Sequence, residues 1–259
     1  MYNENSSPTL NTCTFENNTA TQDGGGMNNY DGSKPTLTEC TFENNNAAFG
    51  GGMYNGNIFS SSSSPTLTAC IFTNNNATAY GGGMYNENSS PTLTDCTFTN
   101  NTATSSGGGG MVNSNQSNST LTDCTFTNNT ATSRGGGMYN SDSDPTLTAC
   151  EFTNNTATAA GGHGGGKGGG GMYNGYDSSP TLTDCAFTNN TANSVGGGMH
   201  NSNQSNPTLE NCIFTSNIAD GHGGGMYNYD YSDPTLTACG FTNNTSNNNH
   251  GGAMFNHVN

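Results

Sequence analysis

Cysteines are the most reactive side chains in this sequence, and all nine recur at similar intervals. They lie at positions 13, 40, 70, 96, 124, 150, 185, 212 and 239, which are 26 to 35 residues apart. None of these intervals has the C-x-x-C spacing that zinc ligands commonly show. If the repeats stack, the cysteine side chains point the same way and one is left over, which disfavours disulfides. We therefore expect a column of buried, reduced thiols, because free cysteine packs as a small apolar residue.

Threonine pairs flank a leucine in most repeats, and they could form a binding surface. In a strand, the two threonines of T-L-T share one face and the leucine takes the other. Stacked repeats would give two outward ranks, about 7 Å apart along each strand and about 4.8 Å apart between strands. These ranks resemble the ice-binding face of β-solenoid antifreeze proteins, although exposed strand positions favour threonine in any sheet. The candidate ligand-surface residues of this kind are Thr92, Thr94, Thr120, Thr122, Thr146 and Thr148.

Tyrosines follow the methionine of many repeats, and they are expected to face outward as a second candidate surface. Their rings could stack on sugars or on another molecule. Alternatively, they stabilise the sheet through contacts between neighbouring repeats. The candidates are Tyr54, Tyr85, Tyr139 and Tyr173.

Acidic residues could bind Ca²⁺ or cleave glycosides if they came together in pairs. One column of the repeat holds Glu39, Asp95, Asp123 and Asp184, but alanine interrupts it at positions 69, 149 and 238. A polysaccharide lyase would also need a cationic base, and the three cations stand alone in their repeats: Lys34, Arg134 and Lys167. We therefore predict no catalytic residue, no metal site and no cofactor, with a lyase or glycosidase as the enzymatic alternative.

Charge and hydropathy exclude some classes of partner for this protein. The formal net charge is −15, and nucleic-acid binding needs clustered basic residues that this sequence lacks. No apolar run approaches the roughly 18 residues of a membrane-spanning helix, so we expect no membrane insertion by this segment. Only 29% of the residues are hydrophobic, which is too few for a thick globular core.

A repeat that covers the whole chain supplies the elements that position these side chains. The consensus is G-G-G-M-Y-N, a polar loop, P-T-L-T-x-C-x-F-x-N-N-x-A and a second loop. Helical periodicity is absent, while threonine, glycine and proline favour short strands and turns. Leu93 lies three residues before Cys96, which breaks the alternation of a strand and predicts a bend between them. We predict an all-β fold, a right-handed parallel β-helix of about nine rungs with 26–35 residues and three short strands each.

Two asparagine positions recur in every repeat, the second residue after the methionine and the third after the phenylalanine. Asn86 and Asn101 are examples. A stacked amide can donate to one neighbouring rung and accept from the other, so we expect asparagine ladders rather than catalytic amides.

The repeat resembles that of the polymorphic outer-membrane proteins, which pairs G-G-A-[ILV] with F-x-x-N. The corresponding residues here are Gly81-Gly82-Gly83-Met84 and Phe98-Thr99-Asn100-Asn101, with methionine in place of the branched residue. The resemblance implies a right-handed β-helix on an extracellular or cell-surface protein, with an adhesive role.

We therefore expect residues 1–259 to form a single β-helix domain, a fragment or repeat unit of a longer surface protein. The predicted function is that of a non-enzymatic structural or adhesin-like solenoid, and the alternative is an ice- or polysaccharide-binding solenoid. The expected partners are a host-cell, matrix or polysaccharide surface and other copies of the chain, joined end to end through exposed strand edges.

Overall fold

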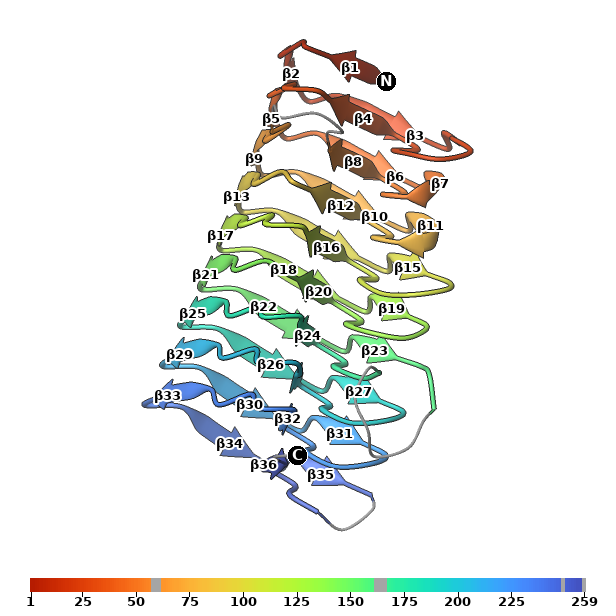
Figure 1. Ribbon diagram of the computed structural model, residues 1–259. Helices are drawn as coiled ribbons and strands as arrows, with labels where there is room; N and C mark the ends of the chain where they lie inside the picture. Colours follow the sequence, from red (N-terminus) through yellow and green to blue (C-terminus); the bar gives the residue numbers. More distant parts are fainter. Residues whose placement is uncertain (57–61, 161–166, 248–249, 258–259) are drawn as a thin grey trace.

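The protein is a stack of short parallel strands that winds as a solenoid (Figure 1). The computed structural model describes residues 1–56, 62–160, 167–247 and 250–257. The strands form four parallel sheets, and each sheet is named here by the residue that it turns inward. Within one turn the chain passes through the methionine, leucine, phenylalanine and alanine sheets in that order.

The four sheets run the length of the solenoid. The methionine sheet comprises β1 (Tyr2–Glu4), β4 (Met27–Tyr30), β8 (Met53–Gly56), β12 (Met84–Glu87), β16 (Met111–Ser114), β20 (Met138–Ser141), β24 (Met172–Gly175), β28 (Met199–Asn201), β32 (Met226–Tyr229) and β36 (Met254–His257). The leucine sheet comprises β2 (Thr9–Asn11), β5 (Thr36–Thr38), β9 (Thr66–Thr68), β13 (Thr92–Thr94), β17 (Thr120–Thr122), β21 (Thr146–Thr148), β25 (Thr181–Thr183), β29 (Thr208–Glu210) and β33 (Thr235–Thr237). The phenylalanine sheet comprises β3 (Thr14–Glu16), β6 (Thr41–Glu43), β10 (Ile71–Thr73), β14 (Thr97–Thr99), β18 (Thr125–Thr127), β22 (Glu151–Thr153), β26 (Ala186–Thr188), β30 (Ile213–Thr215) and β34 (Gly240–Thr242). The alanine sheet comprises β7 (Asn46–Phe49), β11 (Asn76–Tyr80), β15 (Thr102–Ala103), β19 (Thr130–Ala131), β23 (Thr156–Ala157), β27 (Thr191–Ala192), β31 (Ile218–Ala219) and β35 (Thr245–Ser246).

The alanine sheet refines the prediction of three strands per rung. The first asparagine of the N-N pair turns the chain and the second points into the core. The strand begins directly after the second, so a dipeptide such as Thr102–Ala103 pairs with its neighbours. A turn of this solenoid therefore contains four short strands wherever the alanine sheet is present.

Single residues in left-handed conformation make the corners between strands. Asp95, with φ of 54°, makes the bend that was predicted between Leu93 and Cys96. Asn100, with φ of 56°, makes the next corner, where asparagine is favoured because it tolerates this conformation. Gly81, with φ of 68°, turns the chain into the methionine strand. Because the chain turns at these corners, the strands between them form flat sheets, and the outer side chains are positioned by these sheets.

The inner core repeats without variation from turn to turn. Each phenylalanine stacks on the next at 4.7 to 4.8 Å between ring centroids, with planes 2° to 6° apart. Methionine, leucine and cysteine columns fill the remaining interior and are almost fully buried away from the two ends. One turn alone could not bury these side chains, so stacking is what creates the core.

Both predicted asparagine ladders are confirmed. In the methionine sheet, Asn86 Nδ2 donates to Asn113 Oδ1 at 2.9 Å, and the same bond links successive turns along the sheet. In the second ladder, Asn101 Nδ2 donates to Asn129 Oδ1 at 3.0 Å and also to Phe72 O at 2.9 Å. These amides satisfy buried backbone groups at the corner, which would otherwise be costly to remove from water.

A third buried ladder, of serines, was not predicted. The backbone N–H of Ser89 donates to Ser117 Oγ at 3.0 Å, and that of Ser117 donates to Ser143 Oγ at 3.0 Å. The same bond recurs at Ser143, Ser178 and Ser205. A serine two residues before the T-L-T proline in nearly every repeat was the signal in the sequence.

Across the described part of the chain there is no helix of the length and hydropathy that crossing a bilayer requires.

Candidate functional site

The leucine sheet presents the predicted threonine ranks to solvent. Thr92 pairs with Thr120 and Thr120 with Thr146, while Thr94 pairs with Thr122 and Thr122 with Thr148. The first rank is threonine in every turn and is exposed throughout, and its members are Thr9, Thr36, Thr66, Thr92, Thr120, Thr146, Thr181, Thr208 and Thr235. The outward direction and register of these ranks are therefore as predicted.

The second rank of the leucine sheet is less uniform than the first. Its threonines are half-buried or exposed, and Asn11 and Glu210 interrupt it near the ends. The face as a whole offers hydroxyls and methyl groups at the fixed spacing of a parallel sheet. Such a face can contact a flat, repetitive ligand at many points at once.

A further threonine rank, on the phenylalanine sheet, was missed by the sequence analysis. It lies three residues after the motif cysteine in seven of the nine turns, and its members are Thr73, Thr99, Thr127, Thr153, Thr188, Thr215 and Thr242. The first two turns carry Glu16 and Glu43 at this position. Most of these side chains are half-buried, so this rank is less accessible than the first rank of the leucine sheet.

The tyrosine column faces outward from the inner core, as predicted, but its rings are covered and pack against one another, as in the alternative interpretation. Tyr54, Tyr85, Tyr139 and Tyr173 point away from the inner core, but only 7%, 8%, 5% and 1% of their surfaces are exposed. A second layer of side chains covers them, and it comes from the residues directly before the glycine triplets, such as Phe49 at the end of β7 and Tyr80 at the end of β11. The rings are thus packing residues of an outer layer rather than a ready surface.

The glycine triplet explains how this outer layer forms. The left-handed Gly81 makes a tight corner before the methionine strand, and a Cβ placed there would lie 2.9 Å from Tyr85 Cβ. At this corner the ring of Tyr80 lies over the methionine sheet, 6.1 Å from the ring of Tyr85. Phe49 takes the same place one turn earlier and lies 5.5 Å from Tyr85.

Arg134 occupies the equivalent place in a later turn. Its guanidinium lies 5.8 Å from the centroid of Tyr139 and 5.5 Å from that of Tyr173. This geometry is a cation–π contact within the outer layer. Arg134 is therefore held against two aromatic rings of the outer layer.

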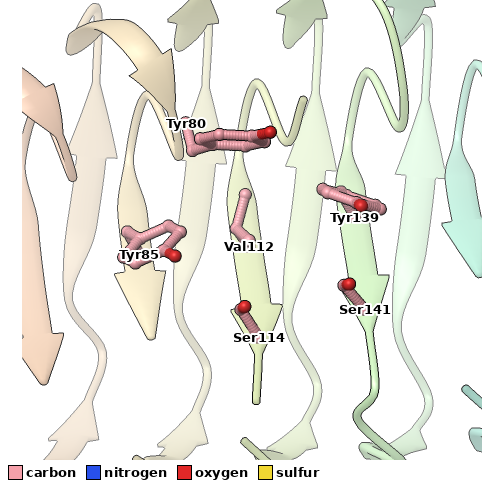
Figure 2. A pocket seen from close by; sticks show the side chains of 6 residues that line it. All are labelled: Tyr80, Tyr85, Val112, Ser114, Tyr139 and Ser141. Atoms are coloured by element: carbon pink, nitrogen blue, oxygen red, sulfur yellow. The ribbon is translucent and has the colours of Figure 1, made fainter. Parts of the chain in front are cut away.

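A cavity of about 150 Å³ interrupts the outer layer between Tyr85 and Tyr139. Val112 forms its floor, and Ser114 and Ser141 line one side (Figure 2). Burial raises the pKa of Tyr85 to about 12, against the opposing influence of the Ser114 hydroxyl. Burial likewise raises the pKa of Tyr139. Both phenols are therefore neutral hydrogen-bonding groups at physiological pH.

The reactive side chains identified from the sequence remain apart or buried. All nine cysteines are free, as expected, and burial raises the pKa of the Cys40 thiol. Asp95 and Asp123 lie exposed at corners of the solenoid. Among the described residues, no group of three or more histidine, cysteine or acidic side chains is placed to hold a metal ion.

Four parallel sheets wound into one solenoid define the parallel β-helix class of protein. A family model described as a right-handed β-helix region matches residues 1–167 and residues 95–259, and the chain belongs to this family. No curated protein sequence matches the chain. Right-handed β-helices occur in surface proteins and in enzymes, so family membership by itself assigns no activity.

Proposed function

We propose that this protein is a non-enzymatic, extracellular or cell-surface solenoid that acts as a stalk or adhesive module. The observation behind the proposal is the first threonine rank, which stays exposed and in register through every turn of the leucine sheet. An array of identical groups at a fixed spacing suits an extended ligand such as a polysaccharide or matrix surface. The resemblance to polymorphic outer-membrane protein repeats supports the same cellular location.

The internal ladders suit a mechanical role as well. Side-chain amides and hydroxyls join each turn to the next inside the solenoid, in addition to the backbone bonds of the sheets. Such a rod holds its outer faces at a constant orientation along its length. A stalk needs this property, and an adhesive face benefits from it because little ordering is needed on binding.

Ice is the second candidate ligand, and the two-rank arrangement favours it. The T-L-T strands place threonines about 7 Å apart along the strand and about 4.8 Å apart between turns. This two-dimensional pattern resembles the ice-binding face of β-solenoid antifreeze proteins. Thermal hysteresis of a protein solution measures this activity directly.

The binding proposal is tested by retention on insoluble cellulose, chitin and pectate. We expect retention by the wild-type protein and its loss in the double variant Thr120→Lys/Thr146→Lys, because long charged side chains then replace two neighbouring threonines of the first rank. The matched control is Thr127→Lys/Thr153→Lys, which places the same charges on the phenylalanine sheet of the same turns and should leave retention intact.

Three outcomes would overturn the proposal. Equal loss of retention in both double variants would show that net charge, and not the threonine face, governs binding. Release of soluble sugars from any of the three polymers would overturn the non-enzymatic assignment. Retention on none of the polymers together with clear thermal hysteresis would replace the adhesive role by ice binding.

A further inference from the structure

The corner between the phenylalanine and alanine sheets repeats almost unchanged through four consecutive turns. The segment F-T-N-N-T-A-T occurs at residues 98–104, 126–132 and 152–158, and residues 187–193 differ from it only in the last position. The corner after the leucine sheet is less uniform, because it carries Asp95, Asp123, Ala149 and Asp184 in the same four turns. The corner beside the alanine sheet therefore presents the same polar groups in four successive turns.

The first asparagine of each N-N pair stands at this corner with its side chain exposed. These residues are Asn100, Asn128, Asn154 and Asn189, all in left-handed conformation with φ of 55° to 56°. Within the described part of the chain, none of the four side-chain amides has a hydrogen-bond partner. The second asparagine differs, since Asn101 bonds to both neighbouring turns. The corner amides thus remain free to bond to a ligand.

Two columns of threonines on the alanine sheet continue the same surface. The first column is half-buried and contains Thr102, Thr130, Thr156 and Thr191, and the second is exposed and contains Thr104, Thr132 and Thr158. Thr132 Oγ1 donates to Thr104 O at 2.7 Å, which holds the hydroxyl in place and leaves its oxygen as an acceptor. Nearly every turn of this corner offers one amide and two hydroxyls, about 4.8 Å from those of the next turn.

The alanine edge, as this surface is called from here on, comprises Asn100, Thr102, Thr104 and their equivalents in the next three turns. It lies on the opposite side of the solenoid from the threonine face of the leucine sheet. In Figure 1, β13, β17, β21 and β25 of the leucine sheet follow the left side, while β15, β19, β23 and β27 of the alanine sheet follow the right side. One molecule can therefore contact two separate surfaces at the same time.

The alanine edge carries no charge. Residues 99–104, 127–132, 153–158 and 188–193 contain no acidic or basic side chain, although the whole chain has a formal net charge of −15. An acidic polymer would be repelled by the net charge and would meet no cation at this edge. A neutral polysaccharide offers hydroxyls that donate to the amide oxygens and accept from the amide nitrogens. The chemistry of the edge therefore fits a neutral polysaccharide.

We propose that the alanine edge is a second binding face for neutral polysaccharide, so that the solenoid bridges two polysaccharide surfaces. This inference rests on the proposed binding role of the threonine face, to which it adds a contact on the opposite side. The edge repeats through four turns, whereas the first threonine rank of the leucine sheet repeats through nine. Retention on a polymer therefore depends mainly on the leucine sheet, and bridging is the activity that requires the alanine edge.

The test mixes the full chain with suspended cellulose and chitin particles and measures two quantities. The first is the protein retained after washing, and the second is aggregation of the particles, followed by turbidity and settling. We expect the wild type to be retained and to aggregate the particles. Thr104→Lys/Thr132→Lys places long charged side chains in two adjacent turns of the edge, so it should be retained like the wild type without aggregating the particles.

A second variant removes two amides without adding charge. Asn100→Gly/Asn128→Gly keeps the left-handed corners, which glycine adopts without strain. It should raise the protein concentration needed for half-maximal aggregation roughly tenfold, because two hydrogen-bonding groups are lost. The matched control is Asn88→Gly/Asn115→Gly, which makes the same change at left-handed corners of the same two turns, after β12 and β16. This control should aggregate the particles like the wild type, and circular dichroism checks that each variant is folded.

The two readouts separate this inference from the proposed function. Retention of the wild type without aggregation of the particles would show that the alanine edge binds no second surface. Aggregation by Thr104→Lys/Thr132→Lys at the wild-type concentration would place the second contact elsewhere on the molecule. Either result would overturn the inference and leave the threonine face intact. Absence of retention on every polymer would overturn the proposed binding role, and this inference with it.

Discussion

The inner core and the outer layer of this solenoid both contain columns of aromatic rings, but the rings of the two columns pack differently. Inside, phenylalanine stacks on phenylalanine with planes at most 6° apart in every turn. Outside, Tyr54 and Tyr85 stack at 5.6 Å with planes 14° apart. Tyr139 and Tyr173 instead meet edge to face at 5.4 Å and 69°.

The difference follows from what each ring contacts. An inner ring has its own equivalents above and below and the fixed columns of the core around it, so one altered side chain disturbs three turns. An outer ring is covered by the residue before a glycine triplet, and this residue changes between turns, for example from Phe49 to Tyr80 and later to Arg134. The inner core therefore requires uniformity, whereas the outer layer tolerates different side chains from turn to turn.

The largest expected effect tests the inner core by removing a ring from the middle of the stack. Phe126→Ala should destabilise the protein by about 3–5 kcal/mol, because the neighbouring rings are too rigidly packed to close the cavity. Tyr139→Ala in the outer layer should cost less, below about 3 kcal/mol, because Tyr80 and Arg134 can move toward the space. Urea unfolding followed by circular dichroism measures both, and equal losses would contradict the distinction.

The second prediction concerns the buried amide ladder. Asn129 accepts from both the backbone N–H and Nδ2 of Asn101, and it donates to Phe98 O and Asn155 Oδ1. Asn129→Ala leaves these buried groups unpaired and should cost about 2–3 kcal/mol.

The control for the ladder is an asparagine at the surface. Asn193 makes one exposed bond, from Nδ2 to Thr158 O at 3.0 Å. Asn193→Ala should change the urea midpoint only slightly, by less than about 0.5 kcal/mol in stability. A cost at Asn129 as small as that at Asn193 would show that the ladder is incidental.

The two regions also differ in how far the sequence predicts them. The period of the repeat is enough to place Leu93, Phe98 and Asn101 inside, because stacking forces like residues over like residues. It cannot reveal that Tyr85 is covered, since the covering residues are chemically unlike one another and reach it through a left-handed glycine turn. The cavity beside Val112 is indicated in the sequence only by the pairing of Gly107 with Val112, and this pairing has meaning only once the two columns are known to touch.

The third prediction uses a buried histidine of the outer layer. His200 occupies the tyrosine column, is fully buried, and has its pKa lowered by that burial to about 3. An unfolded histidine has a pKa of about 6.5, so between these values the unfolded state binds more protons than the folded state. Stability should therefore fall as the pH drops from about 6.5 toward 3, by about 1.4 kcal/mol per pH unit from this group.

Two substitutions test this pH dependence, one that removes the buried histidine and one that adds a second. His200→Tyr should flatten the acid limb of the stability curve, because tyrosine takes up no proton in this range. Tyr173→His, which buries a second imidazole in the adjacent turn, should steepen it. Urea midpoints at pH 7 and pH 4.5 provide the comparison, and an unchanged slope in both variants would show that other groups control the acid response.

The smallest expected effect concerns a single hydrogen bond between turns of the outer layer. The Tyr54 hydroxyl donates to Glu87 Oε2 at 2.8 Å. Burial and then the nearby Glu87 carboxylate raise the pKa of this phenol, so it stays a donor. Tyr54→Phe keeps the ring and should cost about 1 kcal/mol, because Glu87 is half-buried and still accepts from Asn115. The double variant Tyr54→Phe/Glu87→Gln should cost less than the sum of the single ones in a double-mutant cycle. Strict additivity would mean that this pair is not coupled, and the outer layer would then be held by ring packing alone.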